Sequence, residues 1–238
     1  MTDLLVFGPH PDDIEIGLGG AVAGHAARGL RVGLCDLTAG EMGTNGSVEE
    51  RLAEAERARL VLGAAWRENL RWADRQIGKD PGHLEQAVGF IRRHQPRTVA
   101  VPYWSDRHPD HVAASHVLTE AVFNAGLRRY QPGGAAAWKT EWLCYYFIND
   151  DVEPSFVIDV SKHYEKKIDA LDCHASQFQR SASTTLPVAD TRLNTPLFRQ
   201  LVESRDARFG ARVGVRWAEG LVVREPILRA NLLKEDVR

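Results

Sequence analysis

Short apolar runs alternate along this chain with longer segments of helical spacing, and this alternation constrains the fold more than any other feature. Thr2–Phe7, Arg31–Leu37 and Thr98–Pro102 have the composition of strands buried on both faces, and Asn69–Trp72 is a shorter candidate strand. The intervening helices are predicted over Ile14–Arg28, from the Ser47 cap to about Leu62, over Pro81–His94 and from Pro109 to about Ala125. This order predicts right-handed crossovers and a parallel sheet with helices on both faces.

The rest of the chain carries a less regular pattern. Predicted strands cover Glu141–Ile148, Phe156–Val160 and Leu221–Arg224, and predicted helices cover Ser161–Cys173 and Leu197–Phe209. We therefore predict an α/β fold with a mostly parallel sheet and a less regular C-terminal segment. Residues 1–238 would form a single domain, with a core over about 2–180 and a C-terminal extension over about 181–238.

Composition narrows the class of protein. A formal net charge of -2 and a pI near 6.5 argue against a general nucleic-acid surface, which needs a basic stripe. The chain has no apolar run long enough to span a membrane, and no basic and apolar leader precedes its first strand. Its three cysteines, Cys35, Cys144 and Cys173, are far apart and form no CxxC pair, so we expect them to be reduced. These features predict a cytoplasmic protein that binds neither nucleic acid nor membrane.

Two polar clusters follow predicted strands directly. His10–Asp13 (HPDD) comes after the first strand, and Arg107–His111 (RHPDH) comes after the strand that ends at Pro102. Either cluster alone could equally mark a turn or a helix start. Because the carboxyl ends of parallel strands meet at one edge, where open α/β sheets bind ligands, the pair favours a single metal site.

The residue types in these clusters suit metal-assisted hydrolysis. A catalytic zinc site typically has three protein ligands and leaves one position for water. His10, Asp13 and His111 would supply such a set. Asp12 would then lie beside the metal without binding it and would act as the general base.

The second cluster offers two further catalytic roles. His108 would face the site from the start of the same helix as His111, where it could stabilise an oxyanion and protonate a leaving amine. Asp110 would orient one of the imidazoles and raise its pKa.

These two motifs resemble those of the PIG-L/LmbE-like deacetylases, and the likeness extends over about Leu4–Phe178. The resemblance implies a Rossmann-like sheet and removal of acetyl groups from N-acetylglucosamine conjugates. It also implies Zn²⁺ as the cofactor, with Fe²⁺ as an alternative. It carries over the same metal ligands and base, and it makes Asp110 the residue that tunes His108.

Three further stretches are similar to the bacillithiol-pathway branch of this family, the N-acetylglucosaminyl-L-malate deacetylases. They are Gly40–Gly46 with Arg51 following, Asp106–Arg107, and His174–Phe178. Many relatives carry arginine where Asn45 stands here. The likeness implies release of acetate and glucosaminyl-malate from a small anionic sugar conjugate, by a homo-oligomer that is a trimer or a hexamer.

Three residues are predicted to bind such a substrate. Arg51 and Arg107 suit an anionic conjugate, because arginine binds carboxylates in a bidentate manner and malate carries two. Arg51 could instead be a solvated charge on its helix. Asp74 follows a short strand and would accept hydrogen bonds from sugar hydroxyls, although aspartate is also a common turn residue.

Several alternatives remain open at this point. The substrate could be another N-acetylglucosamine conjugate or a chito-oligosaccharide. Two histidines and a carboxylate also suit a non-haem iron oxygenase, or a regulatory protein that holds its metal structurally. A nucleotide-binding site fits less well, because Val22 stands at the third glycine position after Gly17 and Gly19, which we interpret as sites of close helix packing.

Overall fold

One seven-stranded sheet runs through the molecule. The structure, a computed structural model, describes residues 1–179 and 188–228, so the predicted extension and its start at Ser181 lie partly outside the described residues. The strands are β1 (Thr2–Gly8), β2 (Val32–Thr38), β3 (Trp66–Trp72), β4 (Pro96–Pro102), β5 (Trp142–Tyr146), β6 (Phe156–Asp159) and β7 (Ala218–Val222). Their order is β3-β2-β1-β4-β5-β7-β6; β1 to β5 are parallel, and β7 pairs antiparallel with β5 and β6. The predicted α/β fold with a mostly parallel sheet is confirmed.

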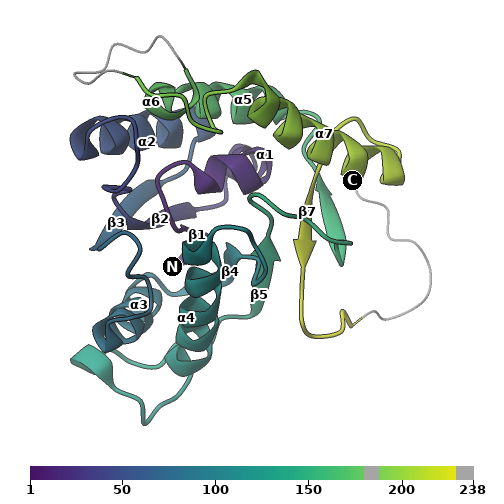
Figure 1. Cartoon of the computed structure of the whole chain (residues 1–238). Helices are drawn as coiled ribbons and strands as arrows, with labels where there is room; N and C mark the ends of the chain where they lie inside the picture. Colours follow the sequence, from purple (N-terminus) through teal and green to yellow (C-terminus); the bar gives the residue numbers. More distant parts are fainter. Residues whose placement is uncertain (180–187, 229–238) are drawn as a thin grey trace.

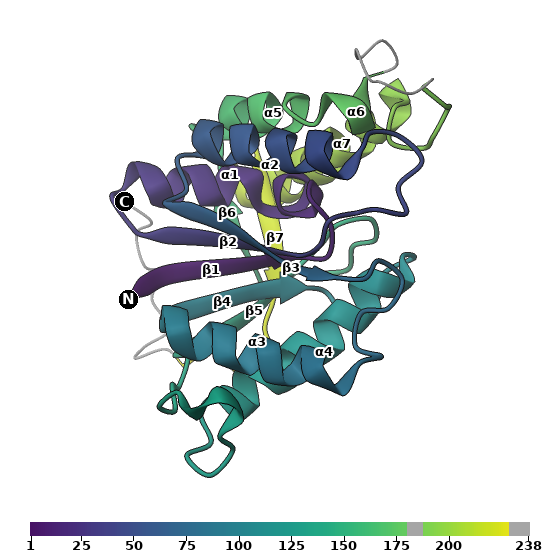
Figure 2. The same ribbon diagram turned by 90° about the vertical axis from the view of Figure 1, so that its left-hand side faces the viewer.

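Helices cover both faces of this sheet, as Figures 1 and 2 show. The helices on one face are α1 (Asp13–Ala27), α2 (Val48–Leu62), α5 (Tyr164–Asp172), α6 (Ala175–Phe178) and α7 (Pro196–Val213). The other face carries α3 (Pro81–His94) and α4 (Pro109–Ala125), and Pro132–Gly134 forms a short 3₁₀ turn. Among the described helices, none is long and apolar enough to cross a bilayer.

Strand β1 shows why each residue from Leu4 to Phe7 is apolar. Leu4 and Val6 pack into the core beneath α1, whereas Leu5 and Phe7 pack into the core beneath α3 and α4. Since successive strand side chains point to opposite faces, a strand with helices on both sides has no polar face. The alternation that predicted this sheet therefore reflects burial on both faces.

The ends of helices and strands lie where the local sequence places them when its capping signals are strong. Where these signals are weak, tertiary contacts decide where the element ends. Ser47 caps α2 in a capping box with Glu50, as predicted. Helix α5 begins at Tyr164 rather than at Ser161, because the Ser161 N–H donates to the Asp159 carboxylate and its hydroxyl donates to the Trp217 carbonyl. Strand β7 begins before the predicted Leu221, because its register is set by pairing with β6.

The glycines of α1 allow close packing, as predicted. A Cβ on Gly17 would lie 2.3 Å from the Tyr146 ring, and a Cβ on Gly20 would lie 2.7 Å from Cβ of Val160. Because no side chain fits at such distances, these positions serve helix packing and do not form a phosphate-binding loop.

A fully buried lysine joins the C-terminal elements to the rest of the fold. Lys167 Nζ on α5 donates to Asp206 of α7 at 2.6 Å and to Glu219 of β7 at 2.7 Å. Glu219 also accepts hydrogen bonds from the backbone N–H groups of Gly20 and Ala21 in α1. The charges are paired and hydrogen-bonded, which a buried charge requires.

A second buried network predicts acid-sensitive stability. The Arg67 guanidinium binds Glu15 and Asp36, and although burial alone would raise the pKa of Glu15, Arg67 lowers it from 4.5 to about 2. A carboxylate with a lowered folded pKa stabilises the protein above its unfolded pKa, and this contribution is lost as pH falls from about 4.5 to about 2. We expect Glu15→Gln to cost about 3 kcal/mol near neutral pH and progressively less in acid. Urea unfolding of both proteins from about pH 6 to about pH 3 checks this; a pH-independent difference would contradict it.

Candidate metal centre and active site

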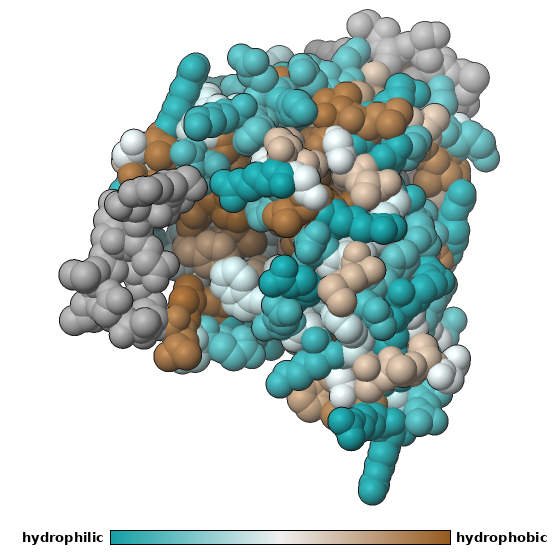
Figure 3. Space-filling view, turned by 180° about the vertical axis from the view of Figure 1, so that it is seen from behind, coloured by the Kyte–Doolittle hydropathy of each residue, from teal (hydrophilic) through white to brown (hydrophobic). Residues whose placement is uncertain are grey.

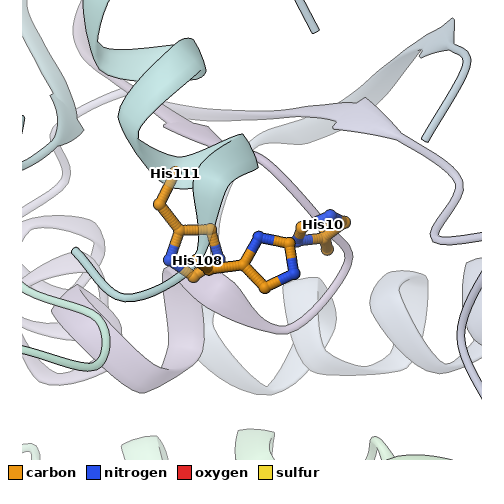
Figure 4. Close-up of side chains that lie close together, drawn as sticks. All are labelled: His10, His108 and His111. Carbon is orange, nitrogen blue, oxygen red and sulfur yellow. The ribbon is translucent and has the colours of Figure 1, made fainter. Parts of the chain in front are cut away.

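Both predicted clusters lie at the carboxyl ends of adjacent parallel strands. His10 is in the turn between β1 and α1, and His108 and His111 stand at the start of α4, which follows β4. Figure 4 shows the three imidazoles side by side. The opposite edge of the sheet has a different character: it carries an apolar cavity of about 220 Å³, and Figure 3 shows apolar side chains gathered on that rear face.

Asp13 joins the two clusters. Its Oδ2 atom lies 3.0 Å from His10 Nδ1 and 3.3 Å from His111 Nε2, and it accepts the backbone N–H of His10 at 2.9 Å. The three side chains are buried, with 8%, 3% and 3% exposure for His10, Asp13 and His111. The structure thus brings the three predicted metal ligands to one point.

In both His10 and His111, the ring nitrogen that does not contact Asp13 faces another carboxylate. His10 Nε2 lies 3.3 Å from Asp74 and 3.5 Å from Asp110, and His111 Nδ1 lies 3.1 Å from Asp106. A carboxylate at the far nitrogen orients a metal-binding histidine and makes it a better ligand. On each ring, the nitrogen that remains available to bind a metal ion is the one that faces Asp13. Two such nitrogens and the Asp13 carboxylate form a donor set that suits Zn²⁺ or Fe²⁺.

The electrostatics of the cluster also favour a cation. Burial alone would lower the pKa of His111, but Asp13 and Asp106 raise it to about 9. Contacts with Asp110, Asp13 and Asp74 likewise outweigh burial and raise the pKa of His10 well above its usual value. Such shifts mean that the buried carboxylates carry more negative charge than neutral imidazoles balance, and a divalent metal ion would supply the missing positive charge.

Among the described residues, two ligand sets bring their donor atoms close enough together for one metal ion, and the predicted set is not one of them. Donor atoms of His10, His108 and His111 lie within 4.8 Å of one another, and so do those of His10, Asp74 and Asp110. The set of His10, Asp13 and His111 therefore remains a prediction, which ligand-by-ligand substitution must test.

Asp12 has the surroundings of a general base. It is the N-cap of α1 with a φ of 146°, a strained conformation for an aspartate, and it is 3% exposed. Burial raises the pKa of Asp12 to about 6, while Arg51, whose Nη2 lies 3.4 Å from the carboxylate, opposes that rise. A carboxylate with a raised pKa accepts a proton more readily than an ordinary one.

His108 and Asp110 are placed differently from each other. The Asp110 N–H donates to His108 Nδ1 at 3.2 Å, which leaves Nε2 of His108 for another partner. Burial lowers the pKa of His108, and the neighbouring His111 and His10 lower it further. The Asp110 carboxylate binds the backbone and guanidinium of Arg75 and lies near His10, so the imidazole that it contacts is His10 rather than His108.

A polar cavity of about 370 Å³ opens above these residues and contains every predicted catalytic and binding residue except Asp110. The loop between β2 and α2 lines it with Met42, Gly43 and Thr44. Asn45 holds this loop, because its side-chain amide exchanges two hydrogen bonds of 2.9 Å with the backbone of Ala189. The long loop thus forms one wall of the site.

The predicted substrate-binding residues differ in whether their polar groups are already bonded within the protein or are available to a ligand. Arg51 is buried and donates to the Gly40 carbonyl at 2.7 Å, so it supports the loop and Asp12. Asp74 accepts the Met42 N–H and contacts His10, and it too is largely engaged. Arg107 is exposed at the cavity rim and is the predicted residue best placed for a ligand.

Sequence reasoning gave no role to four polar residues around the site: Arg75, Asp106, Asn149 and Arg192. Asp106 belongs to the Asp106–Arg107 stretch that resembles the bacillithiol branch, and its place two residues before His108 was a signal for a role in the site. Asn149 follows β5, the strand beside β4, and could have been found from the carboxyl-end rule. The position of Arg192 depends on tertiary structure, and nothing in its local sequence marks it.

His174, the first residue of the His174–Phe178 stretch that resembles the bacillithiol branch, lies beneath this site. It is fully buried, with Nε2 3.5 Å from Glu15. It contacts the Arg67 network and does not line the cavity.

A buried carboxylate beside clustered histidine and aspartate donors, at the ligand-binding edge of an open α/β sheet, is an arrangement that suits metal-assisted hydrolysis. The sequence pattern of the family described as PIG-L, GlcNAc-PI de-N-acetylase, matches residues 5–122. Diacetylchitobiose deacetylase from Thermococcus kodakarensis is 30% identical over 92% of this chain and 81% of its own length. The chain therefore belongs to the PIG-L family and is an N-deacetylase, a hydrolase that acts on an N-acetyl amide.

Two further similarities bear on the fold and the substrate. The conserved protein TT1542 from Thermus thermophilus superimposes with a TM-score of 0.87 and 35% identity, over 99% of this chain and 100% of that one. A protein of Bacillus anthracis named probable N-acetyl-alpha-D-glucosaminyl L-malate deacetylase 2 is 26% identical over 74% of this chain and 80% of its own length.

Proposed function

We propose that this protein is a zinc-dependent deacetylase of an N-acetylglucosamine conjugate, with Fe²⁺ as the alternative metal. The observation that carries the proposal is Asp13 Oδ2, which contacts one nitrogen of both His10 and His111 while Asp12 lies buried next to it. His10, Asp13 and His111 would hold the metal ion, which would polarise the acetyl carbonyl and make a water molecule a better nucleophile.

The surrounding side chains supply the proton transfers. Asp12 accepts a proton from the attacking water, and Arg51 holds the Asp12 carboxylate in place. Nε2–H of His108 donates a hydrogen bond to the negative charge that develops on the carbonyl oxygen, and the proton that Asp12 has taken from the water passes to the leaving nitrogen. Asp110 and Asp74 fix the orientation of His10, and Asp106 fixes that of His111.

For the substrate we propose N-acetylglucosaminyl-L-malate, which would yield glucosaminyl-malate and acetate in bacillithiol biosynthesis. The arginines around the cavity support an anionic aglycone, and so does the name of the Bacillus anthracis relative. The name of the Thermococcus relative favours the alternative, a chito-oligosaccharide, which is neutral at its second sugar.

Acetate release from three substrates distinguishes these proposals: N-acetylglucosaminyl-malate, diacetylchitobiose and plain N-acetylglucosamine. We expect release that is abolished by chelator and strongest with the malate conjugate. If acetate release is strongest with diacetylchitobiose, the substrate is instead a chito-oligosaccharide. No chelator-sensitive release from any of them would reject the proposed function and reopen the oxygenase and regulatory alternatives.

Replacing Arg107 by alanine should weaken binding of the malate conjugate more than it slows turnover. Arg107 is exposed at the rim and is not among the donors of the metal site, so its loss removes a charged hydrogen bond to substrate. We expect KM to rise about 10-fold with kcat nearly unchanged. Steady-state kinetics measures this, and an unchanged KM would remove Arg107 from the site.

Three further features complete the proposal. The protein would act in the cytoplasm, in keeping with three cysteines that form no disulfide. Residues 1–238 would form a single domain, and the chain would assemble as a homo-oligomer, a trimer or a hexamer. Light scattering coupled to size-exclusion chromatography measures the subunit number.

A further inference from the structure

Arg192 enters the catalytic cavity from a part of the chain that the sequence motifs do not reach. It lies in the segment before α7, far beyond the second motif in sequence, and lines the same cavity as His10 and Asp12. Its Nη1 donates to Asn149 Oδ1 at 2.7 Å, and its guanidinium lies 5.2 Å from the centre of the Phe198 ring. Two independent contacts therefore hold a cation at the cavity wall.

Asn149 connects this arginine to the metal side of the site. The Asn149 side-chain amide and backbone N–H both donate to the Asp106 carboxylate at 3.0 Å, and Asp106 contacts His111 Nδ1. The side chain that positions Arg192 is thus itself fixed by the carboxylate that orients a proposed metal ligand. A group bound by Arg192 would have a defined place relative to the reacting acetyl group.

The arginines of the cavity divide into two kinds. Arg51 and Arg75 form ion pairs with Asp12 and Asp110. Within residues 1–179 and 188–228, neither Arg107 nor Arg192 forms an ion pair. Burial lowers the pKa of Arg192, and the positive charge of Arg107 lowers it further. Asp150 and Asp106 act on that pKa in the opposite direction, but neither forms an ion pair with Arg192, so two like charges at one cavity remain able to bind an anionic ligand.

We propose that Arg192 is a specificity-determining residue, which together with Arg107 binds the carboxylates of the aglycone of the substrate. This inference rests on the proposed deacetylase function and names the chemistry that it selects: a conjugate with one or two carboxylates beside the sugar. A neutral second sugar would take water from both guanidinium groups without offering an opposite charge, which is costly.

The test compares the selectivity of the whole protein before and after substitution. For wild type, Arg192→Gln and Arg192→Lys, kcat and KM are measured with N-acetylglucosaminyl-malate and with plain N-acetylglucosamine. We expect Arg192→Gln to lower the ratio of the two kcat/KM values about 10-fold, mainly through KM of the malate conjugate. Arg192→Lys keeps the charge but loses the planar fork, and we expect it to fall between the other two proteins.

Arg199→Gln is the matched control. Arg199 lies on α7 close in sequence to Arg192, but it pairs with Asp172 and Glu203 away from the catalytic cavity, so this variant should keep the wild-type ratio. A purely structural role for Arg192 would instead lower kcat for both substrates alike, and that result would overturn the inference.

The remaining outcomes separate the inference from the function on which it rests. A wild-type protein that releases acetate without preferring the malate conjugate would remove the anion site and leave the deacetylase standing. If wild type strongly prefers the malate conjugate and Arg192→Gln does not reduce that preference, Arg192 is not part of the anion site. No release from either substrate would reject the proposed function itself.

Discussion

Replacing Asp12 by asparagine should lower kcat by roughly 10²–10⁴-fold while the protein keeps its metal. Asparagine has the shape of aspartate but accepts no proton at the pH of the reaction. Asp12 makes none of the contacts with His10 and His111 that converge on Asp13, so the metal ligands should stay in place. Acetate release measured together with metal content per chain gives the result.

Stability must be followed in the same variant. Asparagine leaves Arg51 buried without its nearest anion, and this should cost some stability although the Gly40 carbonyl still accepts from the guanidinium. A thermal unfolding midpoint above the assay temperature excludes loss of fold as the cause of inactivity. Full turnover by folded, metal-loaded Asp12→Asn would show that the base has been misassigned.

Removing the metal should abolish acetate release, and adding Zn²⁺ back should restore it. The reason is that Asp12 can move a proton and His108 can donate a hydrogen bond, but neither polarises the acetyl carbonyl as strongly as a divalent cation does. Dialysis against chelator, metal analysis and titration with Zn²⁺ or Fe²⁺ make the measurement. A metal-free protein that retained its activity would contradict both the metal and the proposed reaction.

Single substitutions then decide which residues hold that metal. If His10, Asp13 and His111 are the ligands, Asp13→Ala and His111→Ala should lose the metal, whereas Asp74→Asn and His108→Ala should keep it. The alternative sets make opposite predictions, because one includes His108 and the other includes Asp74. Metal content per chain after identical purification distinguishes the three sets.

Much of the fold could be predicted because its signals are local. Leu4 to Phe7 is apolar at each position because both faces of β1 are covered, and Ser47 with Glu50 forms a capping box that marks the start of α2. The place of β7 between β5 and β6 could not be predicted in this way. Strand order within a sheet depends on which edges remain free once the earlier strands have paired, and no residue of β7 encodes it.

The residues of the candidate site also divide into those that local sequence signals identify and those that only the tertiary structure brings to the site. His10–Asp13 and Arg107–His111 were identified because each directly follows a strand end and the two strands are parallel neighbours. The burial of Arg51 could not be predicted, since a charged residue on a helix gives no sign that it will pack against Gly40 and Asp12; its role in substrate binding stays a prediction. Arg192 could not be found at all, because it reaches the cavity only through the tertiary position of Asn149 and Phe198.

The position of β7 has a consequence for how the chain folds during synthesis. Strand β6 has β7 as its sheet neighbour, so it leaves the ribosome well before the strand that pairs with it, with α5, α6 and α7 translated in between. Lys167 of α5 is also translated before both of its carboxylates, Asp206 of α7 and Glu219 of β7, and its ammonium group cannot be buried with both ion pairs until β7 is made. Strands β1 to β5 can therefore pair before synthesis ends, but the packing of α5 against the sheet is completed only after β7 has been translated.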